Sequence, residues 1–290
     1  MIDRLEMFIA LAREGHFGRA AESYGVTQPT LSSGLRALED QLGVQLVWRG
    51  SRYQGLTPEG QRVLVWAQRI VGDARALKEE MRAARHGVAG HLRLGCIPTA
   101  LPRVARLTAP FLARNPGARL TILSCSSSEI REGIEALTLD AGITYLDAEP
   151  LGRLTQVPLY LETYRLLERS AEAGPVSWAE AAQRPLCLLT PDMQNRRLVN
   201  AHLARAGAEV APRVESNSTL ALLSHVATGD WAAILPEALA EGIALPAGAV
   251  ARPLSGGEAH HRVGLVVAAR DPHTPTLEAL LDEARRIAED

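Results

Sequence analysis

The chain has 290 residues, of which 47% are hydrophobic and 22% are charged, and its formal net charge at pH 7 is −2. These values are typical of a soluble globular protein and exclude a disordered, collagen-like or strongly basic chain. At this length two or more domains are expected. No apolar run reaches the ~18 residues of a membrane-spanning helix, and two carboxylates stand where a signal peptide is basic, so a cytoplasmic location is expected.

The first 60 residues predict three short helices joined by tight turns. Gly15 and Gly25 each follow a helical stretch, at the place where a residue with left-handed backbone ends a helix. Thr27 precedes a third stretch that has Pro29 in its first turn, as a capping residue does. The inner face of this third helix carries four leucines, Leu31, Leu35, Leu38 and Leu42. The outer face is polar and remains available for a partner.

A wing is expected after these helices. Two short extended pieces, residues 43–48 and 53–56, flank the basic segment at residues 49–52 and predict a two-stranded hairpin. Three helices followed by a wing form a winged helix-turn-helix, whose third helix enters the major groove of DNA. Residues 1–60 hold 6 basic and 7 acidic side chains. DNA recognition would therefore depend on a few well-placed arginines rather than on a general basic field.

One long helix is expected from Glu59 to about Val88. The stretch has no proline, and apolar or small residues recur at alternating spacings of four and three, which is typical of a coiled-coil seam. The larger residues of the predicted dimer seam are Val63, Ile70, Leu77 and Met81. The alternative is a long helix that packs on its own domain.

Residues 91–290 alternate β-rich runs with helical stretches, which predicts an α/β fold. Strands are expected at 91–96, 119–123, 139–145, 186–189, 232–235 and 263–268, and helices at 103–114, 129–137, 195–205, 219–228 and 276–287. The three cysteines are far apart and the histidines lack metal-ligand spacing, so no disulfide framework, metal site or cofactor is expected. No motif of a hydrolase, zinc protease or nucleotide-binding enzyme occurs, and the chain is not expected to be an enzyme.

Several motifs in the N-terminal region resemble, in order, those of the LysR-type transcriptional regulators. They are Phe17-Gly18-Arg19-Ala20-Ala21, Thr27-Gln28-Pro29-Thr30-Leu31-Ser32, Leu35-Arg36-Ala37-Leu38-Glu39, Leu42-Gly43-Val44-Gln45-Leu46 and Leu56-Thr57-Pro58-Glu59-Gly60. The resemblance implies an all-α winged helix-turn-helix at 1–60, a dimerising linker helix at 59–88 and an effector-binding domain at 91–290. The last would have two lobes like a type 2 periplasmic binding protein, lobe I at about 91–160 plus 267–290 and lobe II at about 161–266.

The function that this resemblance implies is sequence-specific regulation of transcription. The chain would bind double-stranded promoter DNA as a homodimer or homotetramer, contact RNA polymerase, and respond to a small polar or anionic metabolite. The DNA contacts would come from the recognition helix and the wing, at Gln28, Pro29, Thr30, Ser32, Ser33, Arg36, Arg49 and Arg52. For each of these side chains the alternative is a solvated position without a role in recognition.

The effector would lie between the lobes, at helix starts whose free N–H groups favour an anion. The candidate residues follow three expected strands and are Thr99, Ala100, Ser126, Ser127, Ser128, Thr190, Gln194, Asn195 and Arg196. Thr99 has the alternative role of a plain helix cap, and Arg196 that of a solvent-facing arginine. Leu137 stands where the family usually has a glycine.

Two other functions stay open. Cys96 and Cys125 flank the candidate effector residues of the first lobe, which allows a redox-responsive regulator whose thiols must be exposed and have a low pKa. A purely architectural DNA-binding protein is the second alternative, although it would not need some 200 residues of α/β domain.

Overall fold

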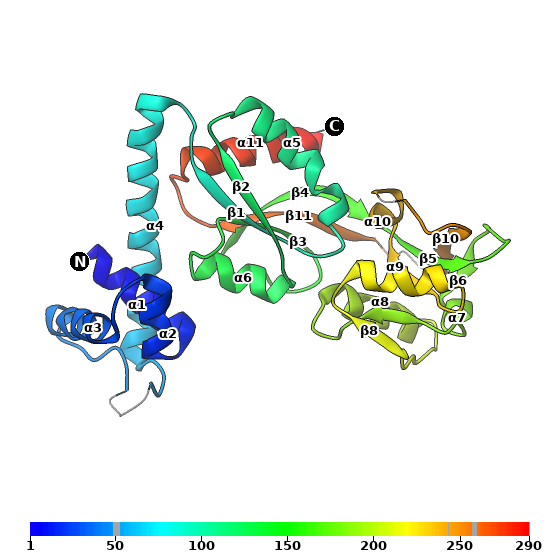
Figure 1. Ribbon diagram of the computed structural model, residues 1–290, viewed down its shortest axis with the longest axis horizontal. Helices are drawn as coiled ribbons and strands as arrows, with labels where there is room; N and C mark the ends of the chain where they lie inside the picture. Colours follow the sequence, from blue (N-terminus) through cyan, green and yellow to red (C-terminus); the bar gives the residue numbers. More distant parts are fainter. Residues whose placement is uncertain (49–52, 243, 257–259, 290) are drawn as a thin grey trace.

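The computed structural model describes residues 1–48, 53–242, 244–256 and 260–289. Figure 1 shows a bundle of short helices, then the upright helix α4, then two α/β lobes. The bundle consists of α1 (Ile2–Glu14), α2 (Phe17–Tyr24) and α3 (Gln28–Leu42). Gly15 and Gly25 end the first two helices with left-handed backbone, at φ 59° and 77°, as predicted.

The three helices bury one hydrophobic core. Phe8 and Leu11 of α1 belong to it together with Leu31 and Leu38 of α3, and all four side chains are fully buried. Burial of a side chain of this size contributes roughly 1.5–3 kcal/mol. Leu42, predicted on the same inner face, is instead 40% exposed, because it is the last residue of α3 and lies outside the core.

The two extended pieces of the wing are paired by a short antiparallel contact. Val47 pairs with Leu56, and the amide of Trp48 donates to the carbonyl of Gly55 at 3.1 Å. The predicted basic tip, with Arg49 and Arg52, lies outside the described residues.

Helix α4 (Pro58–His86) uses two apolar faces. Ala67 and Val71 are fully buried against the bundle, and Val63 is partly buried there. This outcome corrects the prediction for Val63, because that part of α4 packs on its own domain. A second stripe, with exposed fractions from 37% to 61%, consists of Trp66, Ile70, Leu77 and Met81.

Lobe I is built on a five-stranded sheet in the order β2-β1-β3-β11-β4. Its strands are β1 (His91–Cys96), β2 (Arg119–Ser124), β3 (Ala141–Tyr145), β4 (Leu154–Glu162) and β11 (His261–Ala268). The first three are parallel, whereas β11 runs antiparallel to both of its neighbours. The helices are η1 (Leu101–Arg103), α5 (Val104–Arg114), α6 (Ser127–Glu135) and α11 (Pro275–Glu289). In Figure 1, α5 and α11 cover one face of the sheet and α6 the other.

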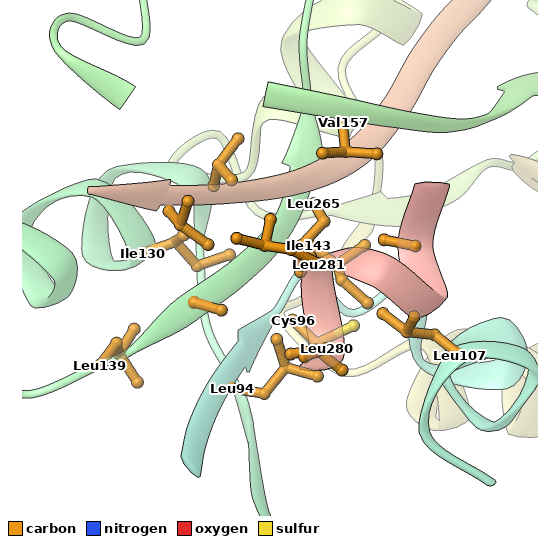
Figure 2. Close-up of a cluster of buried hydrophobic side chains, with 14 of the residues drawn as sticks. Leu94, Cys96, Leu107, Ile130, Leu139, Ile143, Val157, Leu265, Leu280 and Leu281 are labelled. Carbon is orange, nitrogen blue, oxygen red and sulfur yellow. The ribbon is translucent and has the colours of Figure 1, made fainter. Parts of the chain in front are cut away.

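The core of lobe I lies between these layers. Figure 2 shows strand residues such as Leu94 and Ile143 beside Leu280 and Leu281 of α11, while Ile130 comes from α6. The chain is predicted to pass from lobe II back to lobe I at residue 267. It does so earlier in the structure, because β11 of the lobe I sheet begins at residue 261. Pairing with β3 and β4 buries the apolar residues of β11 in this core.

Lobe II contains the four-stranded sheet β6-β10-β5-β9 and the pair β7-β8. Its strands are β5 (Tyr164–Arg169), β6 (Val176–Ser177), β7 (Cys187–Leu189), β8 (Val214–Ser216), β9 (Ala233–Pro236) and β10 (Ala249–Ser255). Its helices are α7 (Trp178–Ala181), α8 (Gln194–Arg205), α9 (Thr219–Thr228) and α10 (Glu237–Gly242). Among the described residues, no helix combines the length and the apolar character needed to cross a membrane.

Candidate DNA-binding surface and effector cavity

The candidate recognition surface is the start and outer face of α3. Thr27 caps this helix, and its hydroxyl accepts from the amide of Thr30 at 3.4 Å. Because the buried leucines fix the opposite face, the polar side chains of α3 project into solvent together. The exposed members of the predicted set are Gln28, Pro29, Thr30, Ser33 and Arg36, and Ser32 is half-buried.

Glu39 ties the wing to this helix, a role that the sequence analysis did not assign. Its carboxylate accepts from the amide of Leu46 at 2.8 Å and from that of Val47 at 3.4 Å. A carboxylate that accepts two amides fixes the start of the wing relative to α3. The spacing between helix and wing is thus held by one side chain.

A small cavity of about 10 Å³ lies where the two lobes meet. It is lined by Ile97, Pro98, Thr99, Ser126, Ser127, Tyr145, Leu189, Met193, Gln194 and Asn195. Five predicted effector residues, Thr99, Ser126, Ser127, Gln194 and Asn195, thus come together from the ends of β1, β2 and β7. A space of this size holds about one water molecule, so a larger ligand requires the lobes to separate.

The two serines at the start of α6 are already hydrogen-bonded. Ser126 caps the helix with Glu129, each side chain bonding to the other residue's backbone amide. Ser127 accepts from the hydroxyl of Thr144 at 2.9 Å, which leaves its own hydroxyl proton free to donate. Ser127 therefore has more capacity for a ligand than Ser126.

Gln194 is a cavity residue whose side-chain amide is buried without hydrogen-bond partners in the described part of the chain. Its side chain is 3% exposed, and both its amide nitrogen and its amide oxygen lack a hydrogen-bond partner among the described residues. It stands at the first position of α8, and the preceding Met193 supplies no side-chain cap. An uncapped helix start presents free N–H groups and a partial positive charge. A buried amide without partners is costly, so this position favours a polar ligand.

A series of hydrogen bonds at the cavity joins the two lobes. Asn195 of α8 donates to the hydroxyl of Tyr145 at 3.0 Å, and Thr99 lies 3.5 Å from the same oxygen. Tyr145 in turn donates to the carboxyl of Glu162. Glu162 is 1% exposed, and burial raises its pKa to about 8. This carboxyl is therefore protonated at neutral pH, and the series of hydrogen-bonded side chains that runs from lobe to lobe carries no net charge.

Four predicted residues lie outside this lining. Ala100 lines a separate cavity of about 60 Å³, and the hydroxyl of Ser128 bonds to that of Ser126 at 3.1 Å. Thr190 lies between the lining residues Leu189 and Met193 without lining the cavity itself. Arg196 is buried, but its guanidinium bonds to the carbonyl of Leu189 and to Glu215, both at 2.6 Å. The prediction that Arg196 meets the effector is thus not matched, since its charge is neutralised within lobe II.

The three cysteines are free, and Cys96 and Cys187 are buried. Burial raises the pKa of Cys96 to about 12 and that of Cys187 to about 11, and it also raises the pKa of the half-buried Cys125. Reaction with an oxidant requires the thiolate, which is scarce at these pKa values. Within the described ranges no group of three or more potential metal ligands occurs.

Family comparisons cover nearly the whole chain. Residues 2–61 match the family described as "Bacterial regulatory helix-turn-helix protein, lysR family", and residues 85–289 match the "LysR substrate binding domain". The chain is 34% identical over 214 residues to a probable hydrogen peroxide-inducible genes activator of Mycobacterium avium. This alignment spans 71% of the present chain and 68% of that protein.

Solved structures agree on the architecture. A full-length OxyR variant from Pseudomonas aeruginosa matches with a TM-score of 0.75 and 28% identity, over 98% of this chain and 97% of that one. Full-length CbnR in complex with its target DNA matches with a TM-score of 0.61, over 99% of both chains. At 23% identity, the second likeness concerns the fold alone.

Proposed function

Because the chain belongs to the LysR family of bacterial transcriptional regulators, we propose that it binds promoter DNA sequence-specifically and changes transcription when a small molecule enters its inter-lobe cavity. The observation that carries the ligand part is Gln194, whose buried amide has neither a donor nor an acceptor opposite it among the described residues. A ligand that offers both would satisfy this amide.

The proposed effector is a small polar molecule. Gln194 would bond to one acceptor and one donor, and Thr99 and Ser127 would add hydroxyl contacts from lobe I. Arg196 is engaged elsewhere, so a negative charge on the effector would be stabilised by the starts of α6 and α8. An oxygen-bearing group, either neutral or a carboxylate, fits this chemistry.

The proposed DNA interface is the exposed face of α3 together with the wing. Gln28 suits adenine and Arg36 suits guanine or a phosphate, because an amide and a guanidinium match those edges. We also propose a homodimer that buries the exposed stripe of α4, the surface defined by Trp66, Ile70, Leu77 and Met81. Pairs of dimers then form the homotetramer expected of the family, which can contact RNA polymerase.

The DNA part is tested by sequencing the genomic fragments that the purified chain captures. Sites centred on interrupted inverted repeats support a regulator, whereas uniform, salt-sensitive capture supports an architectural protein. Arg36→Ala should weaken binding to a captured site by about 10-fold to 100-fold. Arg106→Ala, which removes one exposed charge from lobe I, is the control and should leave affinity unchanged.

The ligand part is tested with Gln194→Leu, which keeps the approximate volume and removes the amide. A reporter driven by a captured promoter should respond to a metabolite extract in the wild type and lose that response in the variant. Promoter affinity without the extract should be the same in both. Gln183→Leu, at an exposed position outside the cavity, is the matched control. A full response from the Gln194 variant would contradict the assignment.

A response to peroxide is the second candidate, because several relatives are named hydrogen peroxide-inducible genes activators. A thiol mechanism fits this chain poorly, since burial raises the pKa of Cys96 and Cys187 well above neutrality. Among the described residues that line the cavity there is also no cysteine. Replacement of all three cysteines by serine should leave any induction by peroxide intact, and loss of induction would favour the thiol mechanism.

A further inference from the structure

Leu137, in the turn after α6, contacts the winged domain. It has a φ of 57°, and elsewhere in the described ranges only glycines have a positive φ. A leucine adopts this left-handed backbone against steric resistance. Its side chain packs on the hydrophobic core of the winged domain, whereas Ile134 and Leu139 on either side belong to the core of lobe I. The strained residue is thus the one that crosses between domains.

Polar contacts from both domains hold the same residue. The carbonyl of Leu137 accepts from Arg93 of β1 at 2.8 Å and from Arg75 of α4 at 3.4 Å. Arg75 also pairs with Glu6 of α1 at 3.2 Å. The other oxygen of Glu6 accepts from the hydroxyl of Tyr24 in α2 at 3.2 Å. One backbone carbonyl of lobe I is therefore linked to three helices of the DNA-binding half.

Helix α6 connects this contact with the effector cavity. Ser126 and Ser127 at its start line the cavity, and Leu137 lies two residues beyond its end. Its nine residues span about 13 Å. The helix is seated closely on the sheet, since a Cβ placed on Gly142 would lie 2.1 Å from Ile130. A helix packed so closely moves as one body, and a displacement at its start reaches its end.

The contact with the winged domain is small and separable. A cavity of about 440 Å³ lies beside it between α1, α4 and α6, and a second, of about 160 Å³, lies between α1, α2, α4 and the turn that follows α6. In Figure 1, α6 faces the winged domain along this side. A contact bordered by open space in this way can separate without unfolding either domain.

We propose that α6 and Leu137 form an internal docking surface for the winged domain of the same chain, and that it couples the effector cavity to DNA binding. The inference rests on the proposed function for the nature of the two ligands. A ligand that displaces the start of α6 changes how Leu137 seats on the winged domain. By reciprocity, DNA that alters the pose of the winged domain changes the start of α6.

The test uses the full-length chain and two variants at one position. Leu137→Gly relieves the strained backbone and removes the contacting side chain, while Leu137→Met keeps a long apolar side chain. Hydrogen–deuterium exchange is measured with and without a promoter fragment captured by the wild type. We expect backbone amides of α1 to exchange several-fold faster in the glycine variant and at the wild-type rate in the methionine variant.

The DNA arm tests the coupling. Promoter DNA should change exchange at residues 126–130 in the wild type and the methionine variant, and should leave it unchanged in the glycine variant although that variant still binds DNA. Wild-type exchange of α1 in the glycine variant would overturn the docking. A DNA-induced change at residues 126–130 in that variant would overturn the route through Leu137. Failure of the wild type to capture any preferred fragment would instead refute the proposed function, and the α1 comparison, which needs no DNA, would still decide the docking.

Discussion

Replacement of Glu162 by glutamine should change the pH dependence of stability. The carboxyl is 1% exposed at the end of β4, where one oxygen accepts from Tyr145 and the other has no partner among the described residues. Burial raises the pKa of Glu162 from 4.5 to about 8. The unpartnered oxygen is the natural place for the retained proton. Glutamine keeps the shape of the protonated side chain and does not titrate.

The sign follows from proton binding in the two states. Between pH 4.5 and 8 the unfolded chain has released this proton while the folded chain retains it. The free energy of unfolding therefore falls by about 1.4 kcal/mol per pH unit as pH rises through this window. Over the whole window the loss is roughly 5 kcal/mol, and above pH 8 it stays constant. Below pH 4.5 both states are protonated and the effect vanishes.

The assay is urea unfolding of the wild type and Glu162→Gln at pH 5, 6, 7 and 8, followed by tryptophan fluorescence. Relative to the wild type, the glutamine variant should gain stability steadily from pH 5 to pH 8. Glu80→Gln, at an exposed position on α4, should track the wild type at every pH. A stability difference between the wild type and the Glu162 variant that does not change with pH would refute the reasoning, because Glu162 would then titrate as it does in the unfolded chain.

Three further predictions concern packing, assembly and thiol reactivity. Gly60→Ala should destabilise the winged domain by about 1–3 kcal/mol, because its Cβ would lie 2.0 Å from the carbonyl oxygen of Leu46; an unchanged melting temperature would contradict this. Leu77→Asp should convert the dimer to a monomer in light scattering, whereas Leu220→Asp, also at an exposed leucine, should not. In the native protein at pH 8, iodoacetamide should label the half-buried cysteine slowly and the two buried cysteines only after unfolding, as read by mass spectrometry.

The helices of the N-terminal half are readable from the sequence because their signals are local. Gly15 and Gly25 mark helix ends through a backbone conformation that disfavours other residues. The two faces of α4 are not readable, since heptad spacing is the same whether a helix packs on its own domain or on a second copy. For this reason the sequence does not single out Trp66, and it does not show that Val63 packs partly on its own domain.

In the α/β half, the sequence predicts six strands, among them the edge strands β2 and β9, and does not predict β4, β5, β6, β8 or β10. β4 has Pro158 within it, which argues against a central strand and is tolerated because β4 lies at the sheet edge. Five cavity residues were found because polar side chains that follow strands gather at one edge. Glu162 and Tyr145 were missed, because nothing local in a strand indicates which neighbour its polar residue will meet.

The lobes are joined by two kinds of contact, and this division bears on how closure responds to pH. On the outside, Arg103 pairs with Glu241 at 2.8 Å, a bond that salt weakens. On the inside, Asn195, Tyr145 and Glu162 form a chain without net charge. Separation of the lobes removes Asn195 from Tyr145 and admits water toward the carboxyl, whose pKa then falls toward its ordinary value. Closure therefore takes up a proton near neutral pH, and an effector that holds the lobes apart should bind more tightly as the pH approaches 8.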